Sequence, residues 1–417
     1  MHDKELYATI LGVTSPWVVR EVEVRAESTE VEVFIEHDGT QELLCPECVA
    51  TGKRHDSRRR SWRHLDTCQY RTILTGDVPR VRCPAHGVRQ IRVPWAEEKS
   101  RFTAMFESLA IDWLGAASIS AVSRRMRLGW DALDGIRERA VRRGLARREA
   151  QPIEQIGVDE TSFQRRHEYV TVVNDLRGGR VLWVGDGRGH ETLGTFYQSL
   201  TPEQLAAIEA VAMDMWKPYV LATKTHVEGW ESKICFDRFH VAKYLGNAVN
   251  DVRKAEHKEL LREEDDRLNR TRFLWLMGPD KLKRLNKDRR VQFNELKAST
   301  LRVARAWAIK ETARGLWGYV RRGWALKAWE RWLGWAFRSR LEPMRKAARI
   351  IKKHLWGILN AVVQDVTNAT SESLNARIQW VKKNACGFRN RERFRTAILF
   401  HCGGLDLYPR PLVHTEA

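Results

Sequence analysis

The sequence lacks any apolar run that approaches the roughly 18 residues required to cross a membrane as a helix. Its first residues, MHDKELYATILG, also lack the charged and then apolar pattern of a secretory signal. We therefore expect neither a membrane anchor nor secretion. No tandem repeat or low-complexity tract stands out along the chain.

Cysteine is scarce as well. Seven cysteines in 417 residues are an odd number, which does not suit a disulfide framework in a chain of this length. A reducing cytosol, with some of the cysteines bound to metal, fits this count better.

Four candidate metal ligands fall in two close pairs. Cys45 and Cys48 form a C-x2-C motif, and Cys83 and His86 form a C-x2-H motif, each beside a proline. Such soft ligands suit one structural, tetrahedral Zn²⁺ in a zinc ribbon that joins two hairpins. The alternative is two ordinary turns with buried thiols. The remaining cysteines are expected to pack in the core: Cys68 (an alternative zinc ligand), Cys235, Cys386 and Cys402.

Acidic residues are fewer than basic residues. Lysine and arginine number 72 against 53 aspartates and glutamates, which gives a net charge of +19. Such a surplus favours a polyanionic partner, for which nucleic acid and an anionic membrane surface are the usual candidates.

Two segments concentrate the positive charge. One is the stretch GKRHDSRRR, and the other is residues 101–149, which resemble two helices with a break near Leu128 and Gly129. In helix-turn-helix motifs the second helix enters the major groove of DNA. An amphipathic helical pair with a solvated basic face is the alternative. The arginines expected to be presented to DNA are Arg58, Arg59, Arg60, Arg137, Arg139, Arg142 and Arg143.

Three acidic residues, far apart in sequence, stand in patterns that suit metal ligands. Asp159 follows the apolar run QIGV, and Asp214 follows AVAM, and both runs read as strands. Glu372 lies at a predicted helix start, TNATSESLNARIQ. Such a fold gathers carboxylates around two divalent cations that can act on a phosphodiester. The alternatives are strand-end or capping aspartates and a first-turn glutamate stabilised by the helix dipole.

The sequence between and around these acids predicts a sheet and then helices. The run 153–184 reads as three strands, and CFDRFHVAKYL as a further strand that enters a helix. Asp237 and His240 form a second candidate pair in that segment. His240 either orients a carboxylate or a scissile phosphate, or packs around the helix.

Residues 241–365 read as almost wholly helical and rich in tryptophan. Trp317, Trp324 and Trp335 would share one face of a helix, and we expect that face to pack in the core. The alternative is that these rings stack on flipped or single-stranded bases, since basic residues surround them.

Four ordered blocks carry a resemblance to a known family. They are GVDE, AMDMWKPY, CFDRFHVAKYL and NATSESLNARIQWVKKNACGFRNRERF, and they resemble blocks of DDE transposases from bacterial insertion sequences, in particular the ISL-three family. The likeness covers nearly the whole chain; His86 departs from it, where a fourth cysteine would be expected. The resemblance implies Asp159, Asp214 and Glu372 as ligands of two Mg²⁺ ions, with supporting roles for Asp237 and His240.

The resemblance also implies the architecture. We expect an α/β protein with an RNase H-like mixed sheet, interrupted by an all-helical insertion and preceded by a zinc ribbon and a helix-turn-helix. The expected parts are a zinc-ribbon β domain at 1–98, a helix-turn-helix region at 99–150, catalytic segments at 151–245 and 366–417, and the insertion at 246–365.

The implied function is that of a bacterial, cytoplasmic and nucleoid-associated transposase. It would bind double-stranded DNA at terminal inverted repeats and at the target, and would cut and join strands without a covalent protein intermediate. A homodimer or larger assembly is expected, because two ends must be brought together. The alternatives are a structure-selective nuclease or resolvase of the same class and a domesticated DNA-binding regulator.

Overall fold

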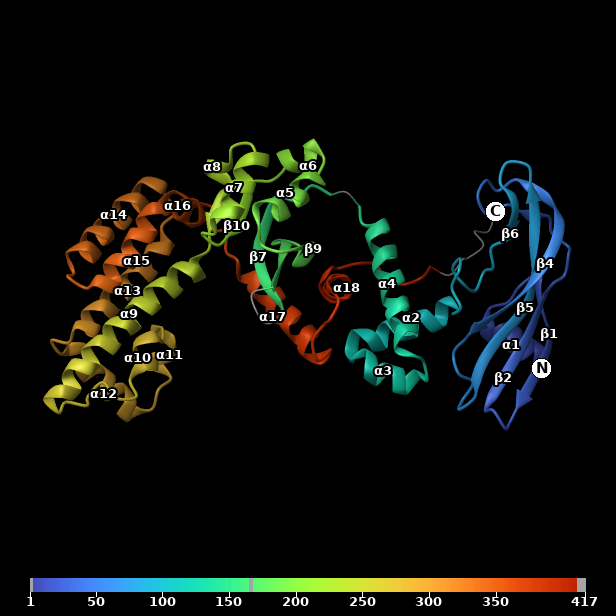
Figure 1. The fold of residues 1–417 in the computed structure, drawn as a ribbon, viewed down its shortest axis with the longest axis horizontal. Coiled ribbons are helices and arrows are strands. Elements are labelled where there is room, and N and C mark those ends of the chain that lie inside the picture. The colour runs from blue at the N-terminus through green and yellow to red at the C-terminus, as the bar shows by residue number, and fades with distance from the viewer. Residues whose placement is uncertain (1–2, 150, 165–167, 411–417) are drawn as a thin grey trace. The chain divides into compact units, whose positions relative to one another are not determined.

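The computed structural model describes residues 3–149, 151–164 and 168–410 (Figure 1). The chain divides into two compact units. The first comprises residues 1–149 together with the segment from Gly404 onward, and the second comprises Ala150–Gly403. Within the described ranges, no helix is both long and apolar enough to cross a membrane.

The first unit begins with one helix and a six-stranded sheet in the order β1-β2-β5-β4-β3, with β6 also paired to β5. β1 and β2 pair as antiparallel strands. Alternation along β2 buries Val31, Val33 and Ile35 on one face. The elements are α1 (Asp3–Leu11), β1 (Trp17–Arg25), β2 (Glu30–His37), β3 (Leu43–Leu44), β4 (Thr51–Arg63), β5 (Arg71–Cys83) and β6 (Gly87–Gln90).

Three helices complete this unit: α2 (Ala104–Ala116), α3 (Ile119–Met126) and α4 (Trp130–Arg147). The side chains of Thr103 and Ser118 cap α2 and α3 by accepting backbone N–H bonds. Arg127 ends α3 in the left-handed region, with φ at 53°, and a two-residue turn then leads into α4. The helical break that the sequence predicts at Leu128 and Gly129 is therefore confirmed.

The second unit contains a five-stranded sheet in the order β11-β10-β7-β8-β9. The three strands predicted within 153–184 are confirmed as the antiparallel run β7 to β9. In contrast, β10 and β11 run parallel to β7, and their short apolar sequences are wholly buried. The strands are β7 (Gln155–Gln164), β8 (Glu168–Asp175), β9 (Arg180–Asp186), β10 (Ala210–Met213) and β11 (Ile234–Phe236).

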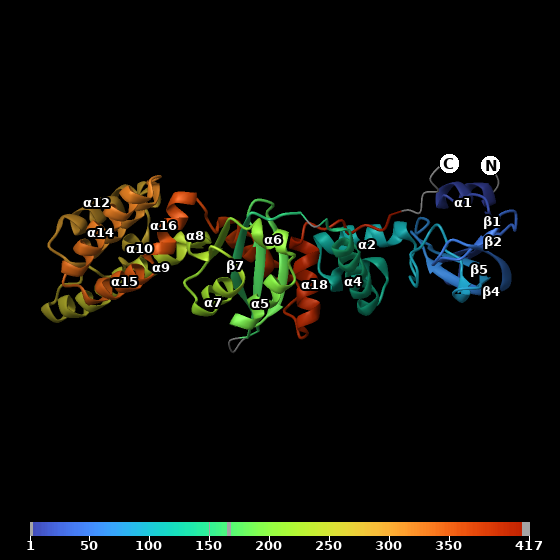
Figure 2. The same ribbon diagram turned by 90° about the horizontal axis from the view of Figure 1, so that it is seen from above.

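Helices cover both faces of this sheet (Figure 2). On one face, α5 (His190–Gln198) and α7 (Lys217–His226) pack on the strands through a shared apolar core. On the other face, α17 (Ala369–Asn384) and α18 (Arg391–Cys402) pack on β8 and β9. The short helices α6 (Pro202–Ala206) and α8 (Trp230–Lys233) precede β10 and β11.

An all-helical segment follows β11, as the sequence predicts. Its long first helix α9 (Arg238–Leu260) begins directly after the strand, at Asp237, which caps the helix. The other helices are η1 (Leu261–Glu263), α10 (Arg272–Leu276), α11 (Pro279–Lys283), α12 (Lys287–Ala298), α13 (Arg302–Gly315), η2 (Leu316–Gly318), α14 (Arg322–Arg338), α15 (Glu342–Lys353) and α16 (Leu355–Gln364).

The expectation that Trp317, Trp324 and Trp335 share one buried helix face is wrong. Trp317 lies in the separate turn η2, half-buried against the core, so it does not share a helix with the others. Trp324 and Trp335 lie on α14 but are 58% and 37% exposed. The buried face of α14 instead carries Trp329 and Trp332, because these rings meet the neighbouring helices.

The C-terminal end of the described chain returns to the first unit rather than continuing the catalytic part expected at 366–417. Arg143 on α4 donates to the Leu407 carbonyl, and the Tyr408 hydroxyl donates to Asp112 on α2 at 2.6 Å. Leu405 lies directly over Gly144, where a Cβ would meet it at 2.6 Å. The last residues therefore bind the α2–α4 helices, and this segment belongs to the first unit.

Candidate functional site

The predicted zinc ligands converge in the first unit. Cys45 and Cys48 lie in the turn between β3 and β4, Cys83 is the last residue of β5, and His86 lies in the turn that leads to β6. Their ligand atoms all lie within 4.8 Å of one another. Cys48 Sγ is 3.6 Å from Cys83 Sγ, and His86 Nδ1 is 3.6 Å from Cys83 Sγ. Among the described residues this is the one such cluster of three or more ligand atoms.

The environment of these ligands favours a metal-bound thiolate. A backbone N–H bond from His86, assisted by the His86 side chain, lowers the pKa of Cys83 to about 6. A thiolate is the form that binds Zn²⁺. Three cysteines and one histidine in a tight cluster therefore support a structural zinc site.

The cysteines outside the cluster differ from the prediction in part. Cys235 and Cys402 are buried, as expected for packing residues. Cys68 and Cys386 are exposed in turns with positive φ, at 56° and 54°, so their expected place in a core is wrong.

In the second unit, three aspartates occupy equivalent positions at one edge of the sheet. Met213 on β10 is the register partner of Val158 on β7 and of Phe236 on β11. The residue after each of these three is an aspartate, so the parallel strands place their three acids side by side. These aspartates are Asp159, Asp214 and Asp237.

His240 joins two of these acids. One turn into α9, its Nδ1 lies 3.2 Å from Asp214 Oδ2, and its Nε2 lies 4.0 Å from Asp237 Oδ2. Asp237 also accepts the Phe239 backbone N–H at 3.1 Å as the cap of α9. The supporting role that the resemblance implies for this pair is compatible with this geometry, in which Asp237 also caps α9.

Glu372 is placed by the contact of α17 with β7. It lies in the first turn of α17, and Asn375, one turn further, donates to Asp159 Oδ2 at 2.6 Å. Gln379 donates to Thr161 Oγ1 at 2.7 Å one turn later. The sequence analysis missed Asn375, although its spacing of three residues from Glu372 places both on one helix face.

A glycine on β7 allows this approach. A Cβ at Gly157 would collide with Ser371 Oγ at the start of α17 and with Leu176. The absence of a side chain therefore lets the helix that carries Glu372 lie close to the strand that carries Asp159.

The acids influence one another electrostatically. The pKa of Asp159 is raised to about 6, chiefly by burial and to a lesser extent by the charges of Glu160 and Asp237. The Glu160 backbone N–H bond and the charge of His240 oppose this rise. Burial and the charge of Asp237 raise the pKa of Glu372. Carboxylates that share one site disfavour each other's ionised form, and a cation nearby removes that cost.

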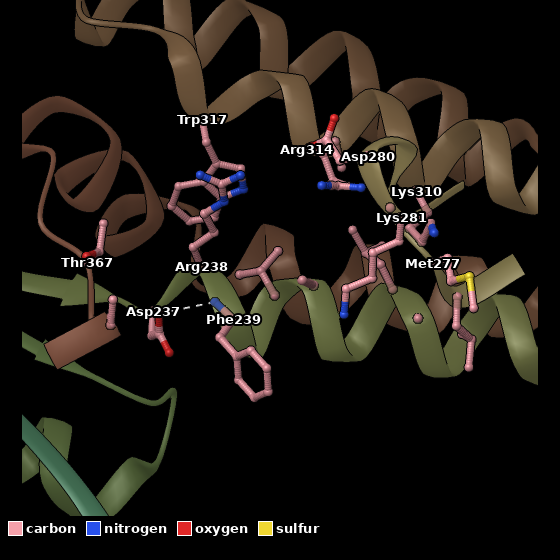
Figure 3. Close-up of a pocket in the computed structure, with 18 of the residues that line it drawn as sticks. Asp237, Arg238, Phe239, Met277, Asp280, Lys281, Lys310, Arg314, Trp317 and Thr367 are labelled. Carbon is pink, nitrogen blue, oxygen red and sulfur yellow. Dashed lines mark hydrogen bonds between the residues drawn. The ribbon is translucent and has the colours of Figure 1, made fainter. Parts of the chain in front are cut away.

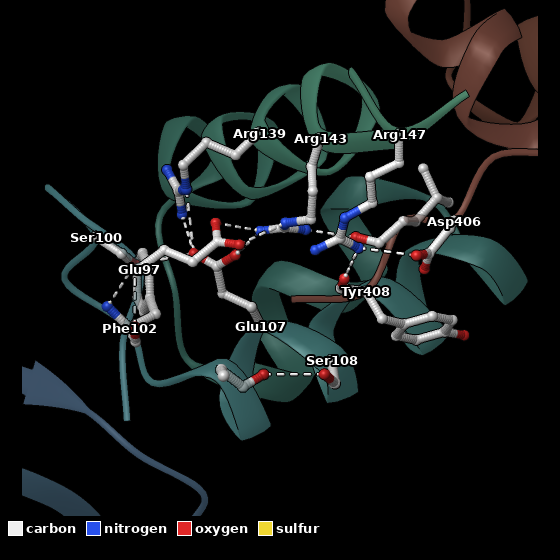
Figure 4. Close-up of polar contacts among 12 residues, drawn as sticks. Glu97, Ser100, Phe102, Glu107, Ser108, Arg139, Arg143, Arg147, Asp406 and Tyr408 are labelled. Atoms are coloured by element: carbon white, nitrogen blue, oxygen red, sulfur yellow. Dashed lines mark hydrogen bonds and ion pairs between the residues drawn. The ribbon is translucent and has the colours of Figure 1, made fainter. Parts of the chain in front are cut away.

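The arginines of α4 are arranged differently from the prediction (Figure 4). Arg137 and Arg143 are only 4% and 9% exposed, so the expectation that they are presented to DNA is wrong for both. Arg143 bridges Glu97 at 2.6 Å and Glu107 at 3.0 Å. The buried carboxylate of Glu107 needs a cation, which explains why Arg143 turns inward, whereas Arg137 pairs with Asp134 one turn before it on α4.

The other basic residues divide into paired and exposed groups. Arg139 pairs with Glu107, and Arg60 donates to the Ser100 carbonyl at 3.2 Å while its guanidinium lies over Trp62. Two further exposed arginines on α3, in the segment SRRM, were missed by the sequence analysis. The exposed arginines of the two segments are Arg54, Arg58, Arg59, Arg101, Arg124, Arg125, Arg127 and Arg142, of which Arg127 also pairs with Asp66.

Comparison with known families assigns each part of the chain. Residues 156–398 match the DDE family of ISL3 elements, described as a transposase. Residues 41–86 match the zinc finger of transposases IS204/IS1001/IS1096/IS1165, and residues 91–141 match the helix-turn-helix domain of transposase family ISL3.

Curated relatives agree with these matches. The chain is 29% identical over 357 residues to the transposase for insertion sequence element IS1001 of Bordetella parapertussis, covering 84% of this chain and 87% of the relative. It is 27% identical over 427 residues to the transposase for insertion sequence element IS1557 of Mycobacterium tuberculosis, covering 94% and 93%. The chain therefore belongs to the ISL3 family of DDE transposases, enzymes that bind DNA and catalyse its cleavage and strand transfer.

Proposed function

We propose that the second unit is an RNase H-like domain whose Asp159, Asp214 and Glu372 bind two Mg²⁺ ions during DNA cleavage and joining. The order β11-β10-β7-β8-β9, with three antiparallel strands and two strands parallel to β7, supports this fold. The observation that carries the proposal is the register of β7, β10 and β11, which sets acids side by side at one edge.

The donor set fits magnesium. It consists of carboxylate oxygens, which Mg²⁺ prefers, and the raised pKa values of Asp159 and Glu372 reflect a cost that a cation offsets. Bound magnesium supplies activation of the attacking hydroxyl and stabilisation of the leaving oxygen.

The chain's own side chains prepare that site. Asn375 holds one oxygen of Asp159, and the Glu160 backbone N–H holds the other at 2.8 Å. His240 fixes the direction of Asp214, whose second oxygen accepts the Met215 N–H at 2.6 Å. These bonds leave the remaining lone pairs of both aspartates for a cation. The nucleophiles are water and then a DNA 3′-hydroxyl, with no covalent bond to the protein.

The first unit recognises the terminal inverted repeats. Its exposed arginines on β4, α3 and α4 supply phosphate contacts, whereas Arg139 and Arg143 hold α4 to α2 through Glu107. Arg137 pairs with Asp134 within α4. A homodimer or larger assembly brings the two ends together. The zinc cluster holds the β3–β4 and β5–β6 hairpins in place, and elemental analysis should find one zinc per chain; a zinc-free, folded protein would contradict this part.

The test is a cleavage and joining assay with Mg²⁺ on the element's own end sequences. Wild-type protein should cut and join the ends, whereas Asp214→Asn and Glu372→Gln should bind the same DNA without cutting it. Equal activity of Asp214→Asn and wild type would overturn the assignment of that ligand. Hydrolysis without joining of a pre-cleaved 3′-hydroxyl end would instead indicate a nuclease or resolvase.

A further inference from the structure

A pocket of about 890 Å³ lies beside the catalytic acids in the second unit (Figure 3). Asp237 and Glu372 line one end of it. The first half of α9, the helices α10, α11 and α13, and the turn η2 supply the remaining walls. The sequence analysis offered base stacking as the alternative role of Trp317, which is one of the residues that line this junction between the sheet and the helical insertion.

The pocket carries cations that have no acidic partner. In the part of the chain that the structure describes, Arg238, Lys281 and Arg284 make no side-chain hydrogen bond or ion pair, and all three line the pocket. Figure 3 shows Arg238, Lys281 and Arg314 extending into the same space from three different helices. Arg314 pairs with Glu311 at 3.2 Å, so its charge is compensated in part. The unpartnered cations therefore suit an anionic ligand.

Aromatic rings accompany these cations. Phe273 on α10 is 66% exposed and Phe239 on α9 is 53% exposed, although both are large apolar side chains. Trp317, half-buried, lines the wall near Arg238, and Phe239 projects on the other side of α9 beside Asp237 (Figure 3). Open aromatic faces among basic side chains are typical of surfaces on which unpaired bases stack.

We propose that this pocket binds an unpaired stretch of the DNA strand next to the phosphate that is cut. Arg238, Lys281 and Arg284 contact its phosphates, while Phe273 and Trp317 stack against its bases. Paired DNA does not satisfy this set of groups, because the faces of its bases are covered by their neighbours in the helix. The proposal rests on the proposed function, since the position of the cut phosphate follows from Asp159, Asp214 and Glu372, and Glu372 lines the pocket.

The test measures single-strand binding by the full-length protein. The probe is a fluorescein-labelled oligothymidylate of about a dozen nucleotides, within the usual range of site sizes, added without Mg²⁺ so that no strand is cut. Phe273→Ala should weaken binding by about fivefold or more. The double variant Lys281→Ala/Arg284→Ala should lower the slope of log affinity against log salt by about 1.4, since two phosphate contacts are lost.

The matched control is Lys287→Ala/Arg290→Ala. It removes the same types of charge from exposed positions of α12 in the same helical segment, outside the pocket. It should leave the affinity and the salt slope nearly unchanged. If both double variants lost affinity and salt slope equally, the effect would be one of general charge, and the proposal that the pocket binds the strand would be overturned.

Crosslinking locates the strand independently of affinity. Iododeoxyuridine in the same oligonucleotide should crosslink under ultraviolet light to Phe239, Phe273 or Trp317. Crosslinks confined to the first unit, or to the exposed Trp324 and Trp335, would overturn the proposal. Such a result would not change the outcome of the cleavage assay. Conversely, if Asp214→Asn cut DNA as well as wild type, the proposed function would be refuted but the binding site would not.

Discussion

At the scale of single residues, neighbours far away in sequence decide what each acid can do. Asp159 has its first oxygen held by its own strand and its second by Asn375, which is 216 residues further along. Asp214 is likewise held by Met215 and by His240. The same type of side chain in the turn after η1, Asp265, bonds only to Arg267, two residues further along. The partners, rather than the residue type, distinguish the site.

Asn375 offers a direct check of this positioning. Asn375→Ala should lower the rate of DNA cleavage about 10- to 100-fold, because side chains that orient metal ligands have effects of this size. Binding of DNA ends should not change. Gln379→Ala is the control, since Gln379 bonds from the same helix to Thr161, outside the acids. An equal loss in both variants would indicate a merely structural role for α17.

His64 predicts how stability depends on pH. It is 4% exposed, it lies 2.9 Å from Thr103 Oγ1, and burial lowers its pKa to about 4. Because the folded-state pKa lies below the ordinary value of 6.5, the fold favours the neutral ring. Stability should therefore be lost as the pH falls from about 6.5 through 4, by up to about 3 kcal/mol.

Denaturant unfolding of wild type and His64→Asn at about pH 7 and about pH 4 checks this expectation. All other titratable groups are the same in both proteins, so their contribution cancels in the comparison. The advantage of wild type over the variant should shrink at the lower pH. An advantage that stays constant would rule out His64 as the titrating group.

At the scale of elements, polar contacts buried between helices are as decisive as apolar ones. The helices α2 and α4 meet around Glu107, which is 1% exposed and bonds to Arg139, Arg143 and Ser100. An arginine-rich helix face that resembles a DNA-binding surface is thus partly an internal scaffold. The exposed arginines are neighbours of the buried ones in the sequence, and the packing of the helices decides which of them are buried.

Two adjacent arginines should consequently respond differently to substitution. Arg143→Met should lower the free energy of unfolding by about 3 kcal/mol, because Glu107 would stay buried with fewer partners. Arg142→Met, at an exposed position, should change it by less than about 0.5 kcal/mol. Chemical denaturation of both variants measures this difference. Similar values for the two would contradict the internal role of Arg143.

At the scale of the whole molecule, the chain's last described residues complete its first unit. Residues 404–410 follow α18 and bind α2 and α4 through Leu405, Leu407 and Tyr408. The stability of the DNA-recognition helices therefore depends on a segment that is synthesised after the entire catalytic part.

Two glycines on α4 test this dependence. Gly144→Ala should destabilise the protein by about 1–3 kcal/mol, because its Cβ would meet Leu405 at 2.6 Å. Gly135→Ala, on the same helix, meets only the end of Arg139 at 3.6 Å. It should stabilise the protein by roughly 0.5–1 kcal/mol through helix propensity. Thermal unfolding compares the two; stabilisation by Gly144→Ala would mean that Leu405 does not lie there in solution.

Much of this molecule was predictable from local patterns. The paired cysteines and His86, the three strands predicted within 153–184, the break at Gly129 and the helical insertion all follow from spacing and periodicity within short segments. Each of these features is decided by nearest neighbours along the chain, so the chain alone carries the information.

The tertiary structure decided what no local pattern contains. It turned Arg137 and Arg143 inward, left Trp324 and Trp335 exposed, returned residues 404–410 to the first unit and added Asn375 to the acids. Arginine and tryptophan suit both a solvated face and a packed one, because each combines a polar group with a large apolar surface. Which face is buried depends on which element, distant in sequence, packs against the helix. That neighbouring surface exists only once the fold has formed.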